Sequence, residues 1–326
     1  MTGAFAEVLA RYPQPIRTAD WSRLESSGGL SGAEIWRGDR DGQPFFYSKG
    51  YPPGVDPLDL SLRHKWCALA SDAGLKFVPR IIANTDGRTF AICEARAWEI
   101  GSWMPGEADF ADRPSRAKLI SACDAVMSLL ECWRGVIVRS EVPPAVRNRL
   151  ALFKEWERDP VLSSPAISPD LERRARTAIA ARLPDARAAL QPWAGRALPC
   201  RLCVRDLRHD HFLFTDETLT GLIDYGAVAW DTPATDAARM LGELAGGDAA
   251  LYELGLQHFA DRLGHEVCPP ELVRALDSSG VVGSIIRWLL RLRRSGVAPA
   301  PVREIELRLT RLIERLERGA FPRLGC

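Results

Sequence analysis

The sequence has little lysine, almost no net charge and no long apolar run. Only five of its 43 basic residues are Lys, so a lysine inside a structured segment needs a specific reason. The formal net charge is +1, which gives no overall attraction toward nucleic acid or an anionic membrane surface. The apolar stretches are too short to span a bilayer, and the first residues are not typical of a signal peptide. We therefore expect a cytoplasmic protein, either a monomer or a dimer, with no nucleic-acid or membrane partner.

Eight cysteines in 326 residues do not suggest a disulfide scaffold, so we expect reduced core residues. One group invites a zinc interpretation, because Cys2His2 is a known ligand set: Cys200, Cys203, His209 and His211. However, the spacing matches no zinc rule, and strand alternation should turn Cys203 to the opposite face from Val204. Two half-buried strand cysteines are the favoured interpretation.

The pattern of apolar residues changes character at Pro105-Gly106. Before it, alternating segments predict strands, and one helical segment is predicted, at 58–73. The expected strands are 21–27, 33–38, 44–49, 78–83, 89–95 and 98–104. After it, we expect helices at 115–133, 144–158, 169–189 and within 235–319, interrupted by short strands at 201–204, 212–215 and 219–223. The layout predicts an α+β protein with a small β-rich lobe, residues 1–104, and a larger helical lobe, residues 105–326, that carries a short β insert.

Two aspartates carry the strongest chemical signal. Asp206 lies just after one short strand, and Asp224 lies 18 residues later, after another strand and before a Tyr-Gly pair. A hairpin between them can direct both carboxylates to one point. Phosphoryl transfer needs such a pair, because one carboxylate orients or deprotonates the attacking hydroxyl and the other holds Mg²⁺ against the phosphates.

The segments VRDLRHDHFLF and GLIDYGAVAWDTPATDAARML resemble the catalytic region of the aminoglycoside phosphotransferase and choline kinase group. That resemblance implies a two-lobed, protein-kinase-like fold and transfer of a phosphoryl group from ATP, with Mg²⁺, to a small hydroxylated molecule. It implies that Asp206 is the catalytic base, and we expect Arg205, beside it in the catalytic loop, to be a second catalytic residue. By the same resemblance, Asp224 is the main metal ligand, and Asp236 is the carboxylate that ties down the catalytic loop.

The resemblance extends more loosely to the first third of the chain. Small residues between two strands allow backbone N–H groups to cover phosphates, and here they are Gly28, Gly29, Ser31 and Gly32. Lys49 ends the following strand, in the position of the family's phosphate-binding lysine. Trp103 and Met104 belong to the expected hinge, where backbone groups would hold the adenine.

Two departures from the family pattern leave alternatives open. His211 stands where the family has Asn, so we expect either a second metal ligand or a phosphate contact there. The helix at 58–73 contains His64 and Lys65 but no Glu to pair with Lys49. Lys49 should therefore depend on Asp224 alone or on another partner. The alternative function is a catalytically impaired, pseudokinase-like protein that binds nucleotide with the same fold.

Overall fold

The computed structural model describes residues 3–24, 32–136, 139–158, 167–295 and 302–318. The chain divides into two compact units. The first unit comprises Met1–Ala108 and His211–Gly226, and the second comprises Asp109–Asp210 and Ala227–Cys326. Lobes 1–104 and 105–326 as separate domains stay a prediction.

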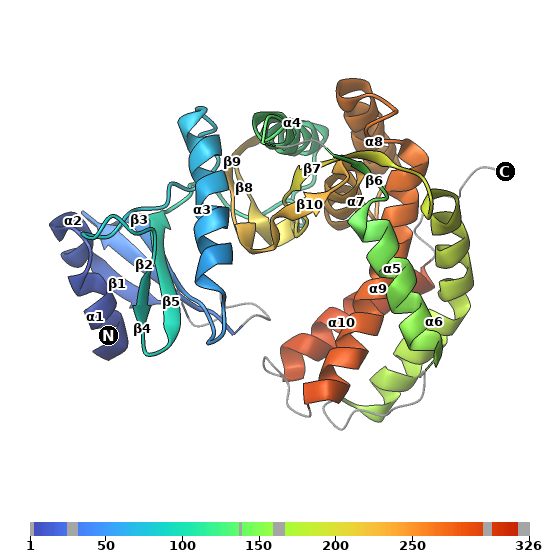
Figure 1. Cartoon of the computed structure of the whole chain (residues 1–326), viewed down its shortest axis with the longest axis horizontal. Coiled ribbons are helices and arrows are strands. Elements are labelled where there is room, and N and C mark those ends of the chain that lie inside the picture. The colour runs from blue at the N-terminus through green and yellow to red at the C-terminus, as the bar shows by residue number, and fades with distance from the viewer. Residues whose placement is uncertain (1–2, 25–31, 137–138, 159–166, 296–301, 319–326) are drawn as a thin grey trace. The chain divides into compact units, whose positions relative to one another are not determined.

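The first unit contains a five-stranded antiparallel sheet in the order β1-β2-β3-β5-β4. The sheet lies between α1 on one face and α3 on the other (Figure 1). A separate β8-β9 hairpin belongs to the same unit. The elements are α1 (Gly3–Ala10), α2 (Gln14–Arg17), β1 (Asp20–Arg23), β2 (Glu34–Arg40), β3 (Gln43–Gly50), α3 (Pro57–Asp72), β4 (Ala91–Cys93), β5 (Arg96–Ser102), β8 (Phe212–Thr215) and β9 (Thr218–Leu222).

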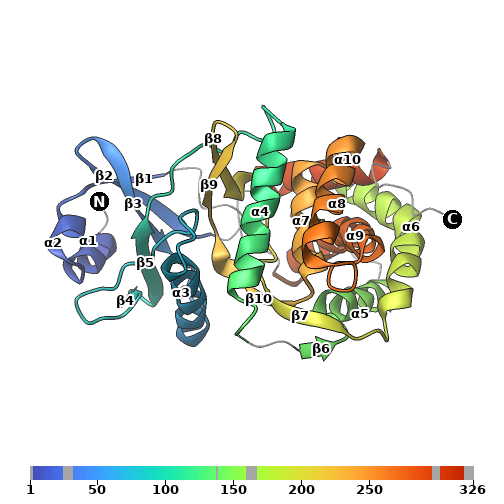
Figure 2. The same cartoon turned by 90° about the horizontal axis from the view of Figure 1, so that it is seen from above.

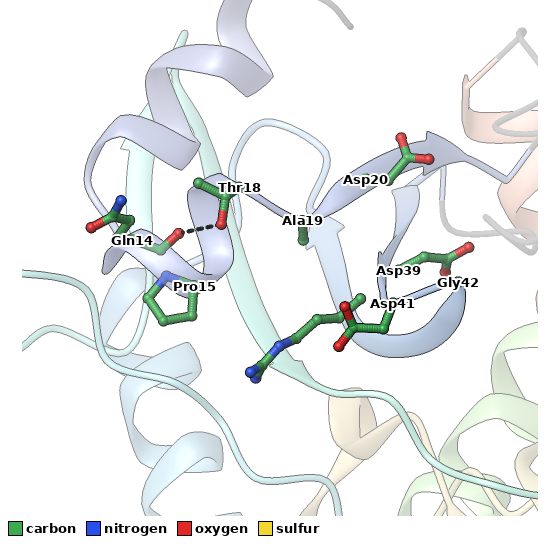
Figure 3. Close-up of a pocket in the computed structure, with 9 residues that line it drawn as sticks. Gln14, Pro15, Thr18, Ala19, Asp20, Asp39, Asp41 and Gly42 are labelled. Atoms are coloured by element: carbon green, nitrogen blue, oxygen red, sulfur yellow. Dashed lines mark hydrogen bonds between the residues drawn. The ribbon is translucent and has the colours of Figure 1, made fainter.

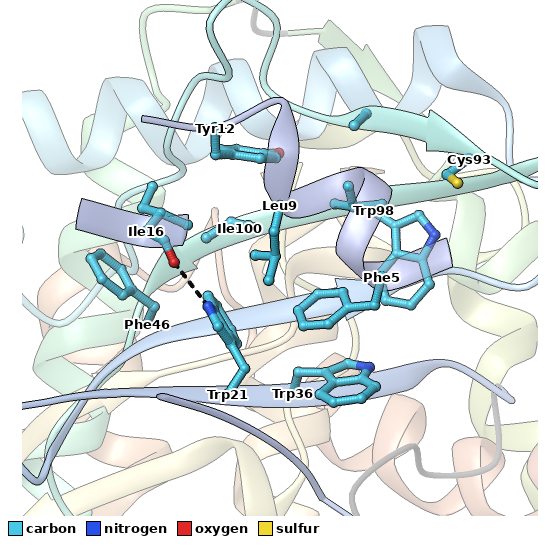
Figure 4. Close-up of a cluster of buried hydrophobic side chains, with 12 residues drawn as sticks. Phe5, Leu9, Tyr12, Ile16, Trp21, Trp36, Phe46, Cys93, Trp98 and Ile100 are labelled. Carbon is cyan, nitrogen blue, oxygen red and sulfur yellow. Dashed lines mark hydrogen bonds between the residues drawn. The ribbon is translucent and has the colours of Figure 1, made fainter. Parts of the chain in front are cut away.

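Aromatic side chains fill the space between α1 and the sheet (Figure 4). Phe5 of α1 stacks on Trp36 of β2 with ring centroids 4.3 Å apart, and meets the edge of Trp21 at 5.3 Å. The indole N–H of Trp21 donates to the carbonyl of Ile16 at 2.9 Å, so this polar atom is satisfied inside the core. In the pairing of β2 with β3, Trp36 lies opposite Ser48. Because side chains alternate along a strand, the next residue, Lys49, faces the side that α3 covers.

One predicted strand is wrong. Residues 78–83 form only an isolated bridge, between Ile81 and Gly101, although the Ile82 N–H still donates to Ile100 O at 2.8 Å. Pro79 within this segment has no N–H to donate, which limits a regular ladder. Helix α1 was not predicted, and it closes the core on this side of the sheet.

The second unit is mainly helical. Its long helix α9 packs against α5, α6, α7, α8 and α10, as Figure 2 shows. A three-stranded sheet, in the order β10-β7-β6, lies at one end of α7 and α5. The elements are α4 (Arg116–Cys132), β6 (Arg139–Glu141), α5 (Pro144–Arg158), α6 (Pro169–Leu190), β7 (Leu198–Cys203), β10 (Ala229–Asp231), α7 (Pro233–Leu244), α8 (Ala249–Leu263), α9 (Pro270–Ser295) and α10 (Val302–Glu317).

Short polar side chains define where several helices begin. The Asp56 carboxylate accepts the Leu58 N–H at the start of α3, and the Ser115 hydroxyl accepts the Lys118 N–H at the start of α4. Each satisfies one of the N–H groups that a helix leaves unpaired at its first turn. None of the described helices combines the length and the apolar character that crossing a bilayer requires.

Candidate functional site

In the first unit, Lys49 and Asp224 form an ion pair although 175 residues separate them in the sequence. The Lys49 ammonium lies 2.9 Å from Asp224 Oδ1. Lys49 is placed by β3, and Asp224 by the end of β9, where the Gly226 N–H also donates to Oδ1 at 3.2 Å. Burial by itself lowers the pKa of Lys49, but the charges of Asp224 and Glu99 outweigh it, so the net pKa is raised. The lysine therefore stays a cation at neutral pH.

The backbone at Asp224 is in a conformation that L-residues rarely adopt, with φ of 65°. Such strain persists only where surrounding structure holds it, and it is concentrated at functional sites. Burial raises the pKa of the Asp224 carboxyl, but the charges of Lys49 and His211 outweigh that effect and hold the pKa well below its usual range. Asp224 is thus ionised, and its side chain is 38% exposed, which leaves its carboxylate accessible to a cation.

His211 lies beside Asp224 in the same unit, with its Nε2 atom 3.9 Å from Asp224 Oδ2. The Ile223 N–H donates to the His211 carbonyl at 3.0 Å, which joins the two ends of the β8-β9 hairpin. An imidazole nitrogen suits Mg²⁺ less well than an oxygen ligand. Asp224 therefore fits Mg²⁺ better than His211 does, and phosphate and water oxygens would have to complete the coordination.

In the second unit, Asp206 lies in the loop that follows β7. Two backbone donors of this loop are bound by one buried carboxylate, because Asp236 of α7 accepts the Val204 N–H at 2.8 Å and the Arg205 N–H at 2.7 Å. Arg205 has φ of 68°, so it is, after Asp224, the second predicted site residue with a positive φ. Its guanidinium Nε lies 3.6 Å from Asp231 Oδ2. Asp236 thus ties down the loop.

Asp206 has a partner that the sequence did not indicate. Arg239 of α7 places Nη2 at 3.3 Å from Asp206 Oδ1 and Nη1 at 2.9 Å from Glu243 Oε1. Asp206 remains 42% exposed, so its carboxylate is open to solvent. Arg239 is therefore a candidate for orienting Asp206.

Glu99 is the main residue of the first unit that the sequence reasoning missed. It lies on β5 directly across from Lys49 in the pairing of β3 with β5, and it is 5% exposed. Its only sequence signal is a lone charged residue between Trp98 and Ile100, and this becomes informative only once the strand register is known. His64, noted in the sequence for standing where a Glu was expected, contacts this carboxylate through Nε2 at 2.7 Å.

The remaining predicted nucleotide contacts are placed only in part. Gly28, Gly29 and Ser31 lie outside the described residues, whereas Gly32 is described and has φ of 72°. The Trp103 N–H already donates to Phe45 O at 2.9 Å, so that group is not free to bind an adenine. Met104 is buried against Gly221, where an added Cβ would lie 2.8 Å from the Met104 Cβ.

A pocket with a volume of about 580 Å³ lies in the first unit, away from Lys49 and Asp224 (Figure 3). Residues of α2, β1 and the turn between β2 and β3 line it, among them Gln14, Thr18, Asp20 and Asp41. None of the chemical groups described above lines it, and its lining contains no lysine. We therefore do not assign the function to this pocket.

The zinc interpretation finds no support in the geometry. Both thiols are buried and contact backbone carbonyls, with Cys200 Sγ 3.9 Å from Glu141 O and Cys203 Sγ 3.3 Å from Asp231 O. His209 instead lies 3.2 Å from Glu243. Within the described part of the chain, no three His, Cys, Asp or Glu side chains are grouped as metal ligands.

Kinase-like phosphotransferases typically combine an α+β architecture with a lysine–aspartate ion pair, here Lys49–Asp224, and with an aspartate loop whose backbone is bound by a buried carboxylate, here Asp236. Residues 24–277 match the model of the phosphotransferase enzyme family, and the chain belongs to that family. No curated protein is similar enough in sequence to count as a relative.

Solved structures of the same kinase-like fold cover nearly the whole chain at low identity. An aminoglycoside phosphotransferase from Alicyclobacillus acidocaldarius is 13% identical, with TM-score 0.59 and coverage of 96% of this chain and 95% of that one. Spectinomycin phosphotransferase APH(9)-Ia, in complex with ADP and spectinomycin, is 12% identical, with TM-score 0.63 and coverage of 91% and 92%. APH(2")-IIIa, in complex with GDP and kanamycin, is 17% identical, with TM-score 0.59 and coverage of 95% and 97%. The predicted fold class and family are thereby confirmed.

Proposed function

We propose that this protein transfers the γ-phosphoryl group of ATP to a hydroxyl of a small molecule. The observation that carries the proposal is the Lys49–Asp224 ion pair, which joins a strand and a loop far apart in sequence at a strained, ionised carboxylate. Family membership supports the reaction class. The ADP and GDP complexes of similar structures support a purine nucleotide, and their spectinomycin and kanamycin support a small acceptor.

In this proposal each residue has a separate task. Lys49 binds phosphate oxygens, together with the backbone N–H groups of the segment from Gly28 to Gly32. Asp224 holds Mg²⁺, assisted by His211. Mg²⁺, when bound, neutralises charge that develops on the transferred phosphoryl group. Asp206 accepts the proton of the attacking hydroxyl and orients it, while Arg205 and Asp236 keep its loop in place.

The test is Mg²⁺-dependent hydrolysis of ATP, with water as the acceptor. Wild type should turn over slowly, EDTA should abolish the turnover, and Asp206→Asn should reduce it by about 10²-fold or more, as expected for the loss of a general base. The matched control is Asp210→Asn, because Asp210 lies in the same segment but pairs with Arg208 at 2.7 Å. This control should keep its turnover. Equal turnover in wild type and Asp206→Asn would contradict the catalytic role.

A second candidate function is nucleotide binding without turnover. It is favoured by one observation, that an imidazole rather than an oxygen ligand lies 3.9 Å from Asp224. Thermal shift with ATP, with GTP and with Mg²⁺ omitted separates the two candidates. Nucleotide-dependent stabilisation without any Mg²⁺-dependent hydrolysis supports the binding protein, and a larger shift with GTP than with ATP would correct the donor nucleotide.

A further inference from the structure

Glu99 is a carboxylate buried at the centre of a hydrogen-bonded cluster in the first unit. Its Oε1 atom accepts the Tyr47 hydroxyl at 2.9 Å. Its Oε2 atom accepts the Tyr51 hydroxyl and lies equally close, at 2.7 Å, to Nε2 of His64. The other ring nitrogen of His64 is 2.8 Å from the Thr89 hydroxyl. Two elements, β3 and α3, therefore hold one carboxylate of β5.

The pairing of β3 with β5 places this cluster next to Lys49 in the sheet. Tyr47 and Lys49 are two residues apart on β3, so their side chains lie on the same face of the sheet as that of Glu99, the partner of Lys49 on β5. Tyr51 follows just beyond the strand, two residues after Lys49. The Lys49 ammonium lies 5.2 Å from the centre of the Tyr51 ring. Gly101 makes room for Tyr47, because an added Cβ there would lie 2.5 Å from Tyr47 Cε1. The local sequence of β5 thus permits the contact between Tyr47 and Glu99.

A buried carboxylate is costly unless donors and an opposite charge compensate it. Burial by itself raises the pKa of Glu99, but the His64 hydrogen bond, the charges of His64 and Lys49 and the Tyr51 hydrogen bond outweigh it and lower the pKa. Glu99 is therefore a fixed negative charge. Asp224, the other carboxylate near Lys49, is also the residue to which the proposed function assigns Mg²⁺. When Asp224 binds Mg²⁺, Lys49 therefore needs a second negative charge that does not bind the metal.

We propose that Glu99, held in place by His64, is the positioning residue for Lys49. Glu99 supplies from β5 the carboxylate that α3 lacks, and the His64–Glu99 contact ties the position of α3 to that of Lys49. The inference rests on the proposed function, because Lys49 must bind phosphate for its position to matter. As a consequence, Glu99 keeps Lys49 in position when Asp224 binds the metal instead of Lys49.

The test compares variants in Mg·ATP hydrolysis, with water as the acceptor. Glu99→Gln keeps the shape of the side chain but removes its charge, so Lys49 should stay bound to Asp224. We expect kcat to fall at least about tenfold, which corresponds to one pKa unit of lost interaction. The KM for ATP should change less than kcat, because weaker ordering of Lys49 and weaker repulsion of the phosphates oppose each other in binding.

Recovery of turnover by a second variant shows whether Glu99 acts through its charge or only through its packing in the core. The double variant His64→Glu with Glu99→Gln returns a carboxylate to the same cluster from α3, with the glutamine amide as its donor. It should recover turnover relative to Glu99→Gln alone. Glu99→Asp, which keeps the charge but shortens the side chain, should lie between wild type and Glu99→Gln. It also serves if Glu99→Gln does not fold.

The matched control is Asp109→Asn, which removes another largely buried carboxylate, paired with Lys118 at 2.9 Å. It should lower the melting temperature and leave kcat per folded molecule unchanged. The inference is overturned if either Glu99→Gln or Glu99→Asp keeps the wild-type kcat. It is also overturned if Glu99→Gln and Asp109→Asn, compared at equal loss of stability, lose the same fraction of kcat. If wild type neither binds nor hydrolyses ATP, the proposed function itself fails, which is a different result from an active wild type with an indifferent Glu99.

Discussion

Asp236→Asn offers a test in which turnover and stability should separate. Asp236 is fully buried and its two oxygens accept the N–H groups of Val204 and Arg205. Asparagine has one acceptor oxygen and an NH₂ group, so one of the two backbone donors would face another donor. The loop that carries Asp206 would lose half of its attachment, and Arg205, at φ of 68°, would be free to relax.

Two effects on the free energy of unfolding oppose each other in this variant. A buried donor left without an acceptor costs about 1–3 kcal/mol. Against this, burial outweighs the two N–H bonds and raises the pKa of Asp236 from 3.8 to about 7, so the ionised carboxylate is itself unfavourable at pH 8. Three pKa units correspond to about 4 kcal/mol, which the neutral amide no longer costs. We expect the two effects to cancel to within about 3 kcal/mol.

Turnover has no such compensation. A displacement of about 1 Å in a catalytic group can reduce the rate by about 10²-fold, and we expect that loss in Mg·ATP hydrolysis. Urea unfolding at pH 8 gives the stability, and hydrolysis at the same pH gives kcat. The reasoning is refuted if Asp236→Asn keeps kcat within about threefold of wild type, or if it loses more than about 4 kcal/mol of stability.

Two further predictions concern stability. Lys49 holds the pKa of Asp224 well below its usual range against the opposing effect of burial, so their ion pair stabilises the fold above pH about 4 and loses this contribution as the pH falls through the lowered pKa. The difference in urea unfolding between wild type and Lys49→Met should therefore shrink on acidification, and a pH-independent difference would argue against the pair. Phe5→Ala removes a fully buried ring stacked on Trp36 and should cost about 3–5 kcal/mol. Leu58→Ala, at a side chain 78% exposed, should stay within about 0.5 kcal/mol of wild type in the same urea unfolding experiment.

The spacing of apolar residues along the sequence correctly predicted those strands and helices that have a clear period of their own. The alternation at 33–38 and 44–49 identified β2 and β3, and the segment at 58–73 became α3 at Pro57–Asp72. The strand at 78–83 failed, since its apolar residues contact β5 but Pro79 prevents a regular ladder. The short helix α1 has only eight residues, too few for a clear helical period.

The same distinction applies to the site. Asp206 and Asp224 could be found because each follows a strand within a short motif, and the structure places Asp224 with Lys49 and His211. Arg239 could not be found in this way. Its contact with Asp206 depends on how α7 packs beside the loop, and an arginine on a helix is ordinarily a solvated surface residue.

Glu99 changes how the missing glutamate of α3 should be interpreted. From the sequence, a helix without Glu suggested an impaired site, because Lys49 had only Asp224 as a visible partner. In the structure Glu99 of β5 is paired with Lys49 across the β3–β5 ladder, and His64, at the expected place on α3, contacts its carboxylate. An apolar side chain of similar volume would often stabilise a core as well as a buried charge does, or better. A costly carboxylate with three partners, on the face that carries Lys49, is therefore better explained by a lysine that must stay positioned than by packing alone.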